Sequence, residues 1–132
     1  MAKAKRVKQL SFMMPNRAGL LSEISAAVSA AKVNINALCA YEMGDNATFM
    51  LTTDGNARAR RALAKLGVEA KEEDVVVVEM PNKMGESQKV GKKIADAGIN
   101  IVYVYGTTGT GKSATCVFLT SDNAKAVKAI NK

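Results

Sequence analysis

The sequence contains no histidine and no tryptophan. Without histidine it lacks the usual general base near neutral pH, every Ser-His or Cys-His nucleophile pair, and every metal site built on imidazole. Its two cysteines, Cys39 and Cys116, are too few for a structural zinc site, and we expect them to be buried thiols. With three Tyr and three Phe, the chain has little material for stacking nucleobases. We therefore expect no enzyme, no metal and no cofactor.

Long apolar stretches are also absent. The longest uninterrupted one is the four valines at residues 75–78, whereas a membrane-spanning helix needs roughly 18 to 20 residues. The N-terminus begins with charged residues, and no apolar signal core or small-residue cleavage site follows. We expect a chain that does not cross a membrane and that resides in the cytoplasm.

The composition is that of a folded protein, with 132 residues, 48% hydrophobic and 23% charged, which allows one ordinary domain or two very small ones. Its net charge of +7 is uneven, because residues 1–66 hold ten Lys and Arg against four Asp and Glu. A cluster of Arg58, Arg60, Arg61 and Lys65 falls on one predicted helix. We interpret it as a solvated helix face. A basic nucleic-acid-binding module remains the alternative, although strands without paired aromatic residues argue against it.

The chain consists of two copies of one pattern. Residues 14–19 (MPNRAG) recur as residues 80–85 (MPNKMG), and residues 33–35 (VNI) recur as 99–101 (INI), both 66 positions later. Residues 48–54 (TFMLTTD) align with 116–122 (CVFLTSD) at an offset of 68, which gives the second copy two extra residues. A repeat of this kind indicates two similar structural units.

Hydrophobic periodicity gives the elements of each copy. The first copy predicts strands over residues 7–13, 35–43, 47–53 and 68–71, with a tight turn at 44–46. It predicts one helix from the spacing of Leu20, Leu21, Ile24, Ala27, Val28 and Ala31, and another over 56–66 that ends at Gly67. The second copy predicts strands over 75–80, 101–105 and 114–120 and keeps the first helical stripe only at Val90, Ile94 and Ala97.

The order of these elements defines the expected fold class. It is α+β, with two ferredoxin-like βαββαβ units over residues 1–73 and 74–132, each an antiparallel sheet with both helices on one face. The second copy stops at Lys132, so its last strand is missing. The strand of four valines would then lie at a sheet edge, which predicts strand sharing in a homodimer.

A βαββαβ unit with Pro-Asn-Arg-x-Gly-Leu-Leu after its first strand and Val-Asn-Ile after its first helix resembles the ACT domain. The resemblance covers nearly the whole chain twice and is greatest to stand-alone tandem ACT proteins. It implies a regulatory protein that binds an amino acid at the interface between two ACT units. The implied site residues are Asn16, Arg17, Ala18, Gly19, Leu20, Asn34 and Ile35, and in the second copy Asn82, Lys83, Met84, Gly85, Asn100 and Ile101.

The chemistry of these residues agrees with a small zwitterionic ligand. A glycine lets the backbone approach a ligand, the following helix offers unpaired N–H groups to a carboxylate, and Arg17 or Lys83 adds a cation. The structural alternative is that Asn16 caps the helix, Asn34 begins a strand and Gly19 permits the turn. The proline that often precedes this glycine in the family is Ala18 or Met84 here. Because Glu86 would repel an incoming carboxylate, we expect the first copy to dominate binding.

Residues 106–113 (GTTGTGKS) spell the phosphate-binding loop GxxxxGK[ST]. That loop works at the start of a helix on a parallel sheet. The residues that follow here are strand formers, so we assign the segment to a hairpin and keep nucleotide binding as a lesser alternative. The sequence thus predicts a non-enzymatic amino-acid-binding regulator, without cofactor, that acts through a homodimer or an unidentified protein partner.

Overall fold

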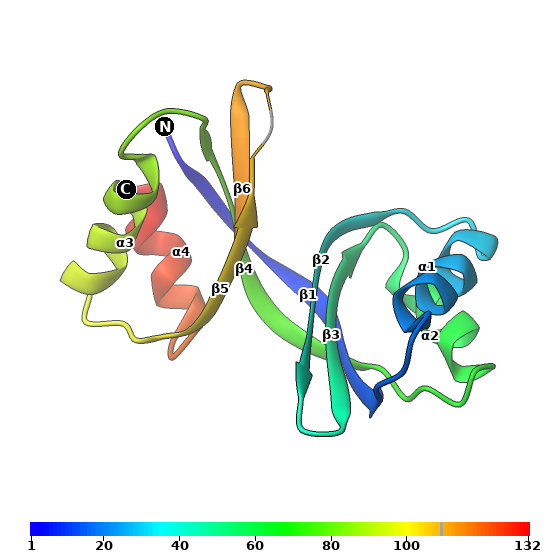
Figure 1. Ribbon diagram of the computed structural model, residues 1–132. Coiled ribbons are helices and arrows are strands. Elements are labelled where there is room, and N and C mark those ends of the chain that lie inside the picture. The colour runs from blue at the N-terminus through cyan, green and yellow to red at the C-terminus, as the bar shows by residue number, and fades with distance from the viewer. Residues whose placement is uncertain (109) are drawn as a thin grey trace. The chain divides into compact units, whose positions relative to one another are not determined.

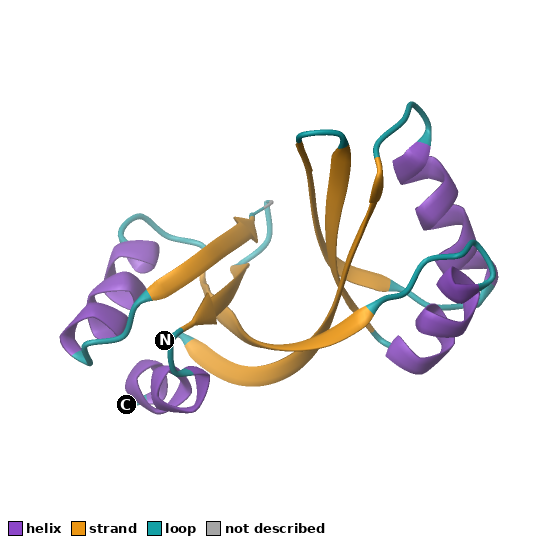
Figure 2. Cartoon of the chain, turned by 90° about the horizontal axis from the view of Figure 1, so that it is seen from below, coloured by secondary structure: helices purple, strands orange, loops and turns teal. Residues whose placement is uncertain are grey.

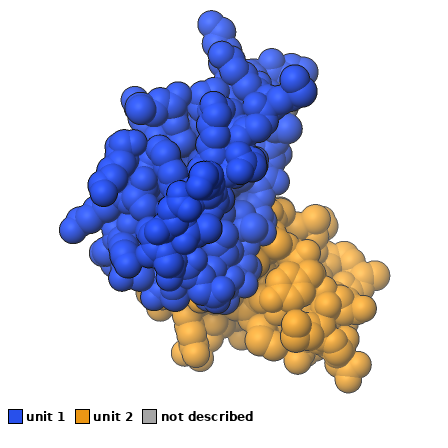
Figure 3. All heavy atoms as spheres, turned by 90° about the vertical axis from the view of Figure 1, so that its left-hand side faces the viewer, with its two compact units in different colours: residues 1–7, 74–132 blue, residues 8–73 orange. Residues whose placement is uncertain are grey.

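The computed structural model describes residues 1–108 and 110–132. The described elements run β1 (Lys3–Pro15), α1 (Leu20–Ala30), β2 (Ile35–Met43), β3 (Asn46–Thr53), α2 (Asn56–Ala64), β4 (Lys71–Pro81), α3 (Glu86–Asp96), β5 (Ile101–Thr107), β6 (Ser113–Thr120) and α4 (Asn123–Asn131), as Figure 1 shows. They form two compact units (Figure 3): unit 1 comprises Met1–Val7 and Asp74–Lys132, and unit 2 comprises Lys8–Glu73. The expected bounds of 1–73 and 74–132 differ from these units at residues 1–7.

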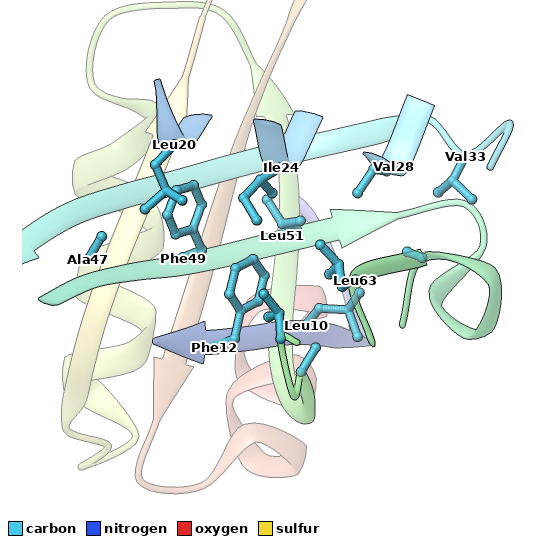
Figure 4. Close-up of a cluster of buried hydrophobic side chains, with 13 residues drawn as sticks. Leu10, Phe12, Leu20, Ile24, Val28, Val33, Ala47, Phe49, Leu51 and Leu63 are labelled. Atoms are coloured by element: carbon cyan, nitrogen blue, oxygen red, sulfur yellow. The ribbon is translucent and has the colours of Figure 1, made fainter. Parts of the chain in front are cut away.

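Unit 2 has the strand order β2-β3-β1-β4, with α1 and α2 on one face of its strands (Figure 2). The core between helices and strands contains Leu10, Ile24, Leu51 and Leu63, all fully buried (Figure 4). Phe12 and Phe49 are register partners, and their rings stack with centroids 5.2 Å apart. Each large apolar side chain buried in this way contributes about 1.5–3 kcal/mol. This is the predicted βαββαβ pattern.

Unit 1 repeats the pattern with the strand order β1-β4-β6-β5 and helices α3 and α4. Val76, Val78, Ile94 and Phe118 lie in its core. The last element of unit 1 among the described residues is α4. The fourth position of the sheet is filled instead by the start of β1, and Ala4 is part of the same core.

The predicted sheet edge at the four valines is therefore wrong. Strand β4 lies between β1 and β6 and is hydrogen-bonded to both. The sequence reasoning assumed that a fourth strand must follow the second helix, whereas the extended N-terminal segment supplies it. The argument for strand sharing in a homodimer does not hold for β4.

Of the two predicted strands, the one over 68–71 is wrong, because residues 68–70 form no strand and β4 begins only at Lys71. From Lys71, β4 runs without a break through the one predicted over 75–80. The acidic residues between them were expected to form a connection, but each has a partner along the strand. Glu72 lies 3.7 Å from the guanidinium of Arg60, Glu73 accepts a hydrogen bond from the Gln9 side chain at 3.2 Å, and Asp74 pairs with Arg6. Because all three make these contacts in the extended conformation, this segment has no need to turn.

The sequence alignment of the last strands is wrong by one residue. Phe12 pairs with Phe49, and Val78, its equivalent 66 positions on, pairs with Cys116. The structural offset in β3 and β6 is therefore 67, and the second copy carries one extra residue here. A slip of one residue reverses the faces of a strand, which explains why Leu51 and Phe118 occupy equivalent core positions.

The first helix of each unit begins later than the asparagine signals suggested. The residues before α1 and α3 are Gly19 and Gly85, with φ of 85° and 84°, and neither helix has a side-chain cap. Asn16 is therefore not a helix cap. Leu21, expected in the buried stripe, is 50% exposed. Gly67 does end α2 in the left-handed conformation (φ 79°), as predicted.

Candidate functional site

The loops β1–α1 and β4–α3 have the same backbone arrangement. Asn16 N–H donates to the Asp45 carbonyl at 2.9 Å, and Asn82 N–H donates to the Lys112 carbonyl at 2.8 Å. Each loop is thereby joined to the hairpin of its own unit. A positive φ at the following glycine, which side chains with a Cβ rarely adopt, then starts the helix. The sequence repeat is thus a repeat of loop geometry.

The β4–α3 loop borders a cavity of about 310 Å³ inside unit 1. This volume lies at the lower end of the range for small-molecule pockets. Three segments form its walls: the end of β4 with the start of α3, the end of β5, and β6. The lining residues are Met80, Pro81, Asn82, Lys83, Glu86, Ser87, Gly106, Thr107, Thr108, Ala114 and Cys116. The Asn82 amide donates to the Gly111 carbonyl at 3.1 Å and so ties the loop to the hairpin.

Opposite charges meet in this cavity. The Glu86 side chain is 12% exposed, and its Oε2 lies 2.8 Å from the Nζ of Lys89, which is largely exposed. The hydrogen bond from Lys89, with further attraction from the N-terminal amine and Lys83, holds the pKa of Glu86 below its ordinary value. Glu86 is therefore ionised at neutral pH. Lys83 supplies the opposite charge, and within the described residues its ammonium has no ion-pair partner.

The polar groups of the first copy are engaged within unit 2. The Asn16 amide donates to Glu42 at 2.7 Å, and the Arg17 guanidinium lies 2.5 Å from Glu23 of α1. Both predicted polar groups are thus already bonded to carboxylates. A ligand carboxylate at this loop would have to compete with Glu42 and Glu23 for them.

The remaining predicted residues divide into four sets. Ala18, Gly19, Met84 and Gly85 are exposed in the loops, with Met84 100% exposed, and Leu20 is buried in the core of unit 2. Asn34 and Asn100 stand before β2 and β5, where their N–H groups donate to the side chains of Asp54 and Ser121. Ile35 and Ile101 pack against the two cores. In the second copy, only Asn82 and Lys83 of the predicted set line the cavity.

Sequence reasoning did not assign the hairpin side of the cavity to the site. Gly106 is the informative residue, because a Cβ there would lie 2.7 Å from Cys116 Sγ and 3.0 Å from the Thr115 carbonyl oxygen. The sequence offered this glycine only as part of the phosphate-loop spelling. Burial raises the pKa of the Cys116 thiol, which disfavours the reactive thiolate.

The segment GTTGTGKS lies between two antiparallel strands. Its first two residues end β5, and Ser113 begins β6. No helix follows, so the segment lacks the helix start that a phosphate-binding loop requires. The assignment to a hairpin is confirmed for the described residues, and Gly109 lies outside them. Among all the described residues, no cluster of three metal-ligating side chains occurs. No helix formed by these residues is long and apolar enough to span a membrane.

The chain is a tandem of βαββαβ units with matching loops before the first helices. The family of ACT domain pairs matches residues 5–132, and the chain belongs to this family. A comparison with curated proteins finds no match.

Solved structures agree with this assignment. A crystal structure of a protein from Bacteroides thetaiotaomicron is 26% identical, has a TM-score of 0.88, and covers 97% of this chain and 88% of its own. The ligand-free regulatory subunit of aspartate kinase from Thermus thermophilus is 14% identical with a TM-score of 0.73, over 99% of this chain and 95% of its own. The regulatory subunit of aspartate kinase from Thermus flavus is 17% identical with a TM-score of 0.63, over 99% of this chain and 94% of its own. The two kinase subunits share the fold.

Proposed function

We propose that the protein is a non-catalytic regulator that binds an amino acid or a closely related small zwitterion. The observation that carries this proposal is the pair of opposite charges, Lys83 and Glu86, on the walls of the cavity in unit 1. A zwitterion has one group for each. Membership of the ACT domain pair family supports the same class of function, and the family's fold recurs in regulatory subunits of an amino-acid-pathway kinase.

In this proposal the ligand carboxylate faces Lys83 and the first turn of α3. The helix N-terminus there has backbone N–H groups without intrahelical partners and a partial positive charge. The ligand ammonium faces the ionised Glu86, whose carboxylate it would share with Lys89. The side chain of the ligand lies against Met80, Ala114 and Cys116, which line the same cavity. Glu86, which on sequence grounds weakened the second copy, thus becomes a partner for the ammonium group.

The contacts in the two loops support the second copy as the better site for this purpose. Lys83 is available, whereas Asn16 and Arg17 of the first copy are bonded to Glu42 and Glu23. We therefore propose that unit 1, which contains the second copy, dominates binding. The sequence alone favours the first copy. The proposal rests on contacts inside unit 1, and the expected ligand position between two ACT units stays a prediction.

Regulation would follow from differential affinity. A ligand shifts an equilibrium between two arrangements only by its preference for one of them. The arrangement that the ligand favours then acts on a protein partner or on the second copy of a homodimer. Among the described strands, β5 is the last in the sheet order, next to β6, and it carries Val102 and Val104, which are 59% and 49% exposed. An edge strand of this kind suits association of two copies. The cytoplasm stays the expected compartment.

The test is a thermal-shift screen against the twenty amino acids, with ATP and Mg²⁺ included. Binding to the native state adds about 2.7 kcal/mol at a hundredfold excess over the dissociation constant. We expect a shift with one amino acid or a few related ones. The amide and the N-acetyl derivative of that amino acid, each lacking one of its charges, should give no shift. A shift with ATP alone, or no shift at all, would contradict the proposal.

A further inference from the structure

Helix α2 presents a strongly basic surface, although unit 2 as a whole is nearly neutral. Unit 2 holds eight Lys and Arg against seven Asp and Glu. Four of these cations lie on α2 and its C-cap, with no acid among them: Arg58, Arg60, Arg61 and Lys65. All four are exposed, while Ala59 and Leu63 on the inner side of the helix are fully buried. Half of the cations of unit 2 therefore lie on this one helix, exposed to solvent.

Only part of this charge is neutralised within the unit. Arg60 donates from Nε to the Ala70 carbonyl at 3.1 Å and lies 3.7 Å from Glu72, so it is held against the segment before β4. Arg61 and Lys65 form no ion pair among the residues that the structure describes. Two cations one turn apart thus face the solvent without a counter-charge.

A groove runs beside these cations. Its volume is about 350 Å³, and it lies between α2 and the segment that returns after Gly67. Its lining residues are Ala57, Arg60, Arg61, Ala64, Val68, Glu69 and Ala70. The small alanine side chains leave the space, while the two guanidinium groups belong to its wall. Guanidinium groups bind carboxylates in a planar, two-point geometry.

We propose that this groove, together with Lys65, docks an acidic segment of a partner protein. The segment carries carboxylates for Arg61 and Lys65 and small apolar side chains for the alanine-lined floor. This surface lies in unit 2, apart from the residues of the ligand site in unit 1, and it is the surface through which the regulator contacts a partner. Charge complementarity would steer the encounter and fix its register.

A protein segment fits this surface better than a nucleic acid does. Glu69 lines the groove and would repel a continuous phosphate backbone, whereas a peptide can leave a gap between its carboxylates. The patch is confined to one short helix of nine residues on a nearly neutral unit, whereas tight binding of nucleic acid involves on the order of 6–10 phosphate contacts.

The test uses the full-length protein and a short fluorescent peptide in which glutamates alternate with alanines. The variant R61E/K65E reverses the proposed contacts. The control variant K125E/K128E reverses two exposed lysines of α4 and changes the net charge equally. At low salt we expect the peptide to bind about tenfold more weakly to R61E/K65E and within about twofold of the original affinity to the control. A peptide with lysines in place of the glutamates should bind R61E/K65E and not the unmodified protein.

Three results would overturn the proposal. One is an equal loss of affinity in both variants, which would mean that net charge alone attracts the peptide. Another is the absence of binding by the unmodified protein at low salt. The third is tighter binding of a labelled oligothymidylate than of the acidic peptide, lost in R61E/K65E, which would make the partner a nucleic acid. Amide exchange at Leu63 checks that the variants fold, and R61Q/K65Q gives a milder version of the same test.

Discussion

Both backbone groups of Ala4 are bonded to the side-chain amide of Asn131. The Ala4 N–H donates to Asn131 Oδ1 at 2.7 Å, and Asn131 Nδ2 donates to the Ala4 carbonyl at 2.9 Å. The amide of one residue in α4 thus behaves like the peptide group of a neighbouring strand. It holds the start of β1 in the place where unit 1 has no C-terminal strand.

Replacing Asn131 with alanine should therefore destabilise unit 1. The change removes both hydrogen bonds and leaves the partly buried polar groups of Ala4 without this partner, which costs about 1–3 kcal/mol. Urea unfolding followed by circular dichroism measures the loss. The exposed neighbour Lys128 provides a control, because Lys128→Ala should change stability by less than about 0.5 kcal/mol. Equal stability of both variants would mean that the N-terminal segment is held by its strand pairing alone.

Gly106 should not accept a side chain. Its Cβ would meet Cys116 Sγ at 2.7 Å and the Thr115 carbonyl at 3.0 Å, and overpacking of this kind costs about 1–3 kcal/mol. We expect Gly106→Ala to lower the midpoint of thermal unfolding. Combining it with Cys116→Ala should recover part of the loss, since the nearer contact is removed.

Gly91 gives the matched control for this prediction. It lies within α3, and a Cβ there would meet nothing within 4 Å. Gly91→Ala should therefore stabilise the protein by roughly 0.5–1 kcal/mol, because glycine is unfavourable inside a helix. The two glycine-to-alanine changes are expected to act in opposite directions, and a destabilising Gly91→Ala would contradict the reasoning.

The repeat allowed most of the fold to be predicted, because matched segments such as MPNRAG and MPNKMG place equivalent elements in register. The N-terminal strand could not be placed in the same way. A solvated leader is what the sequence suggests for this segment, from Lys3, Lys5, Arg6 and Lys8. The sequence does not reveal that Asp74 and Asn131 bond to it. Pairing between residues so far apart in the chain is decided by tertiary contacts.

The candidate site was predictable only on its loop side. Asn82 and Lys83 were found from the repeat, but Glu86 was judged by its charge alone and taken as a repellent. Its role depends on Lys89, one turn further along α3, and on the hairpin residues across the cavity. The two loops are similar in sequence but differ in their contacts. In the first copy, Asn16 and Arg17 are bonded to the carboxylates of Glu42 and Glu23.

The ionisation of Glu86 should depend on Lys89. In the folded protein the pKa of Glu86 lies below its ordinary value, chiefly because of the hydrogen bond from Lys89. Ionised Glu86 thus stabilises the fold above its unfolded pKa, and this contribution is lost as the pH falls through its folded pKa. Lys89→Ala should raise the pKa of Glu86 toward its ordinary value.

An NMR titration of the Glu86 side-chain carboxyl in the two proteins measures this change. Lys92→Ala is the control, because Lys92 pairs with Asp96 at 3.0 Å and not with Glu86. An unchanged titration in Lys89→Ala would mean that the 2.8 Å contact is not made in solution. At acidic pH, where Glu86 becomes protonated, ligand binding should report the same change, because a protonated Glu86 cannot neutralise the ligand ammonium.

Lys83 should contribute more to ligand binding than Arg17. Lys83 lines the cavity and forms no ion pair in the described residues, whereas the Arg17 guanidinium is 2.5 Å from Glu23. Removing a charged partner of a bound carboxylate costs about 1.5–3 kcal/mol, so Lys83→Gln should weaken binding about tenfold or more. Arg17→Gln should leave the affinity within about twofold, and calorimetry with the amino acid selected in the screen measures both. The reverse order would return the site to the first copy, and equal losses would mean that the two loops share the ligand.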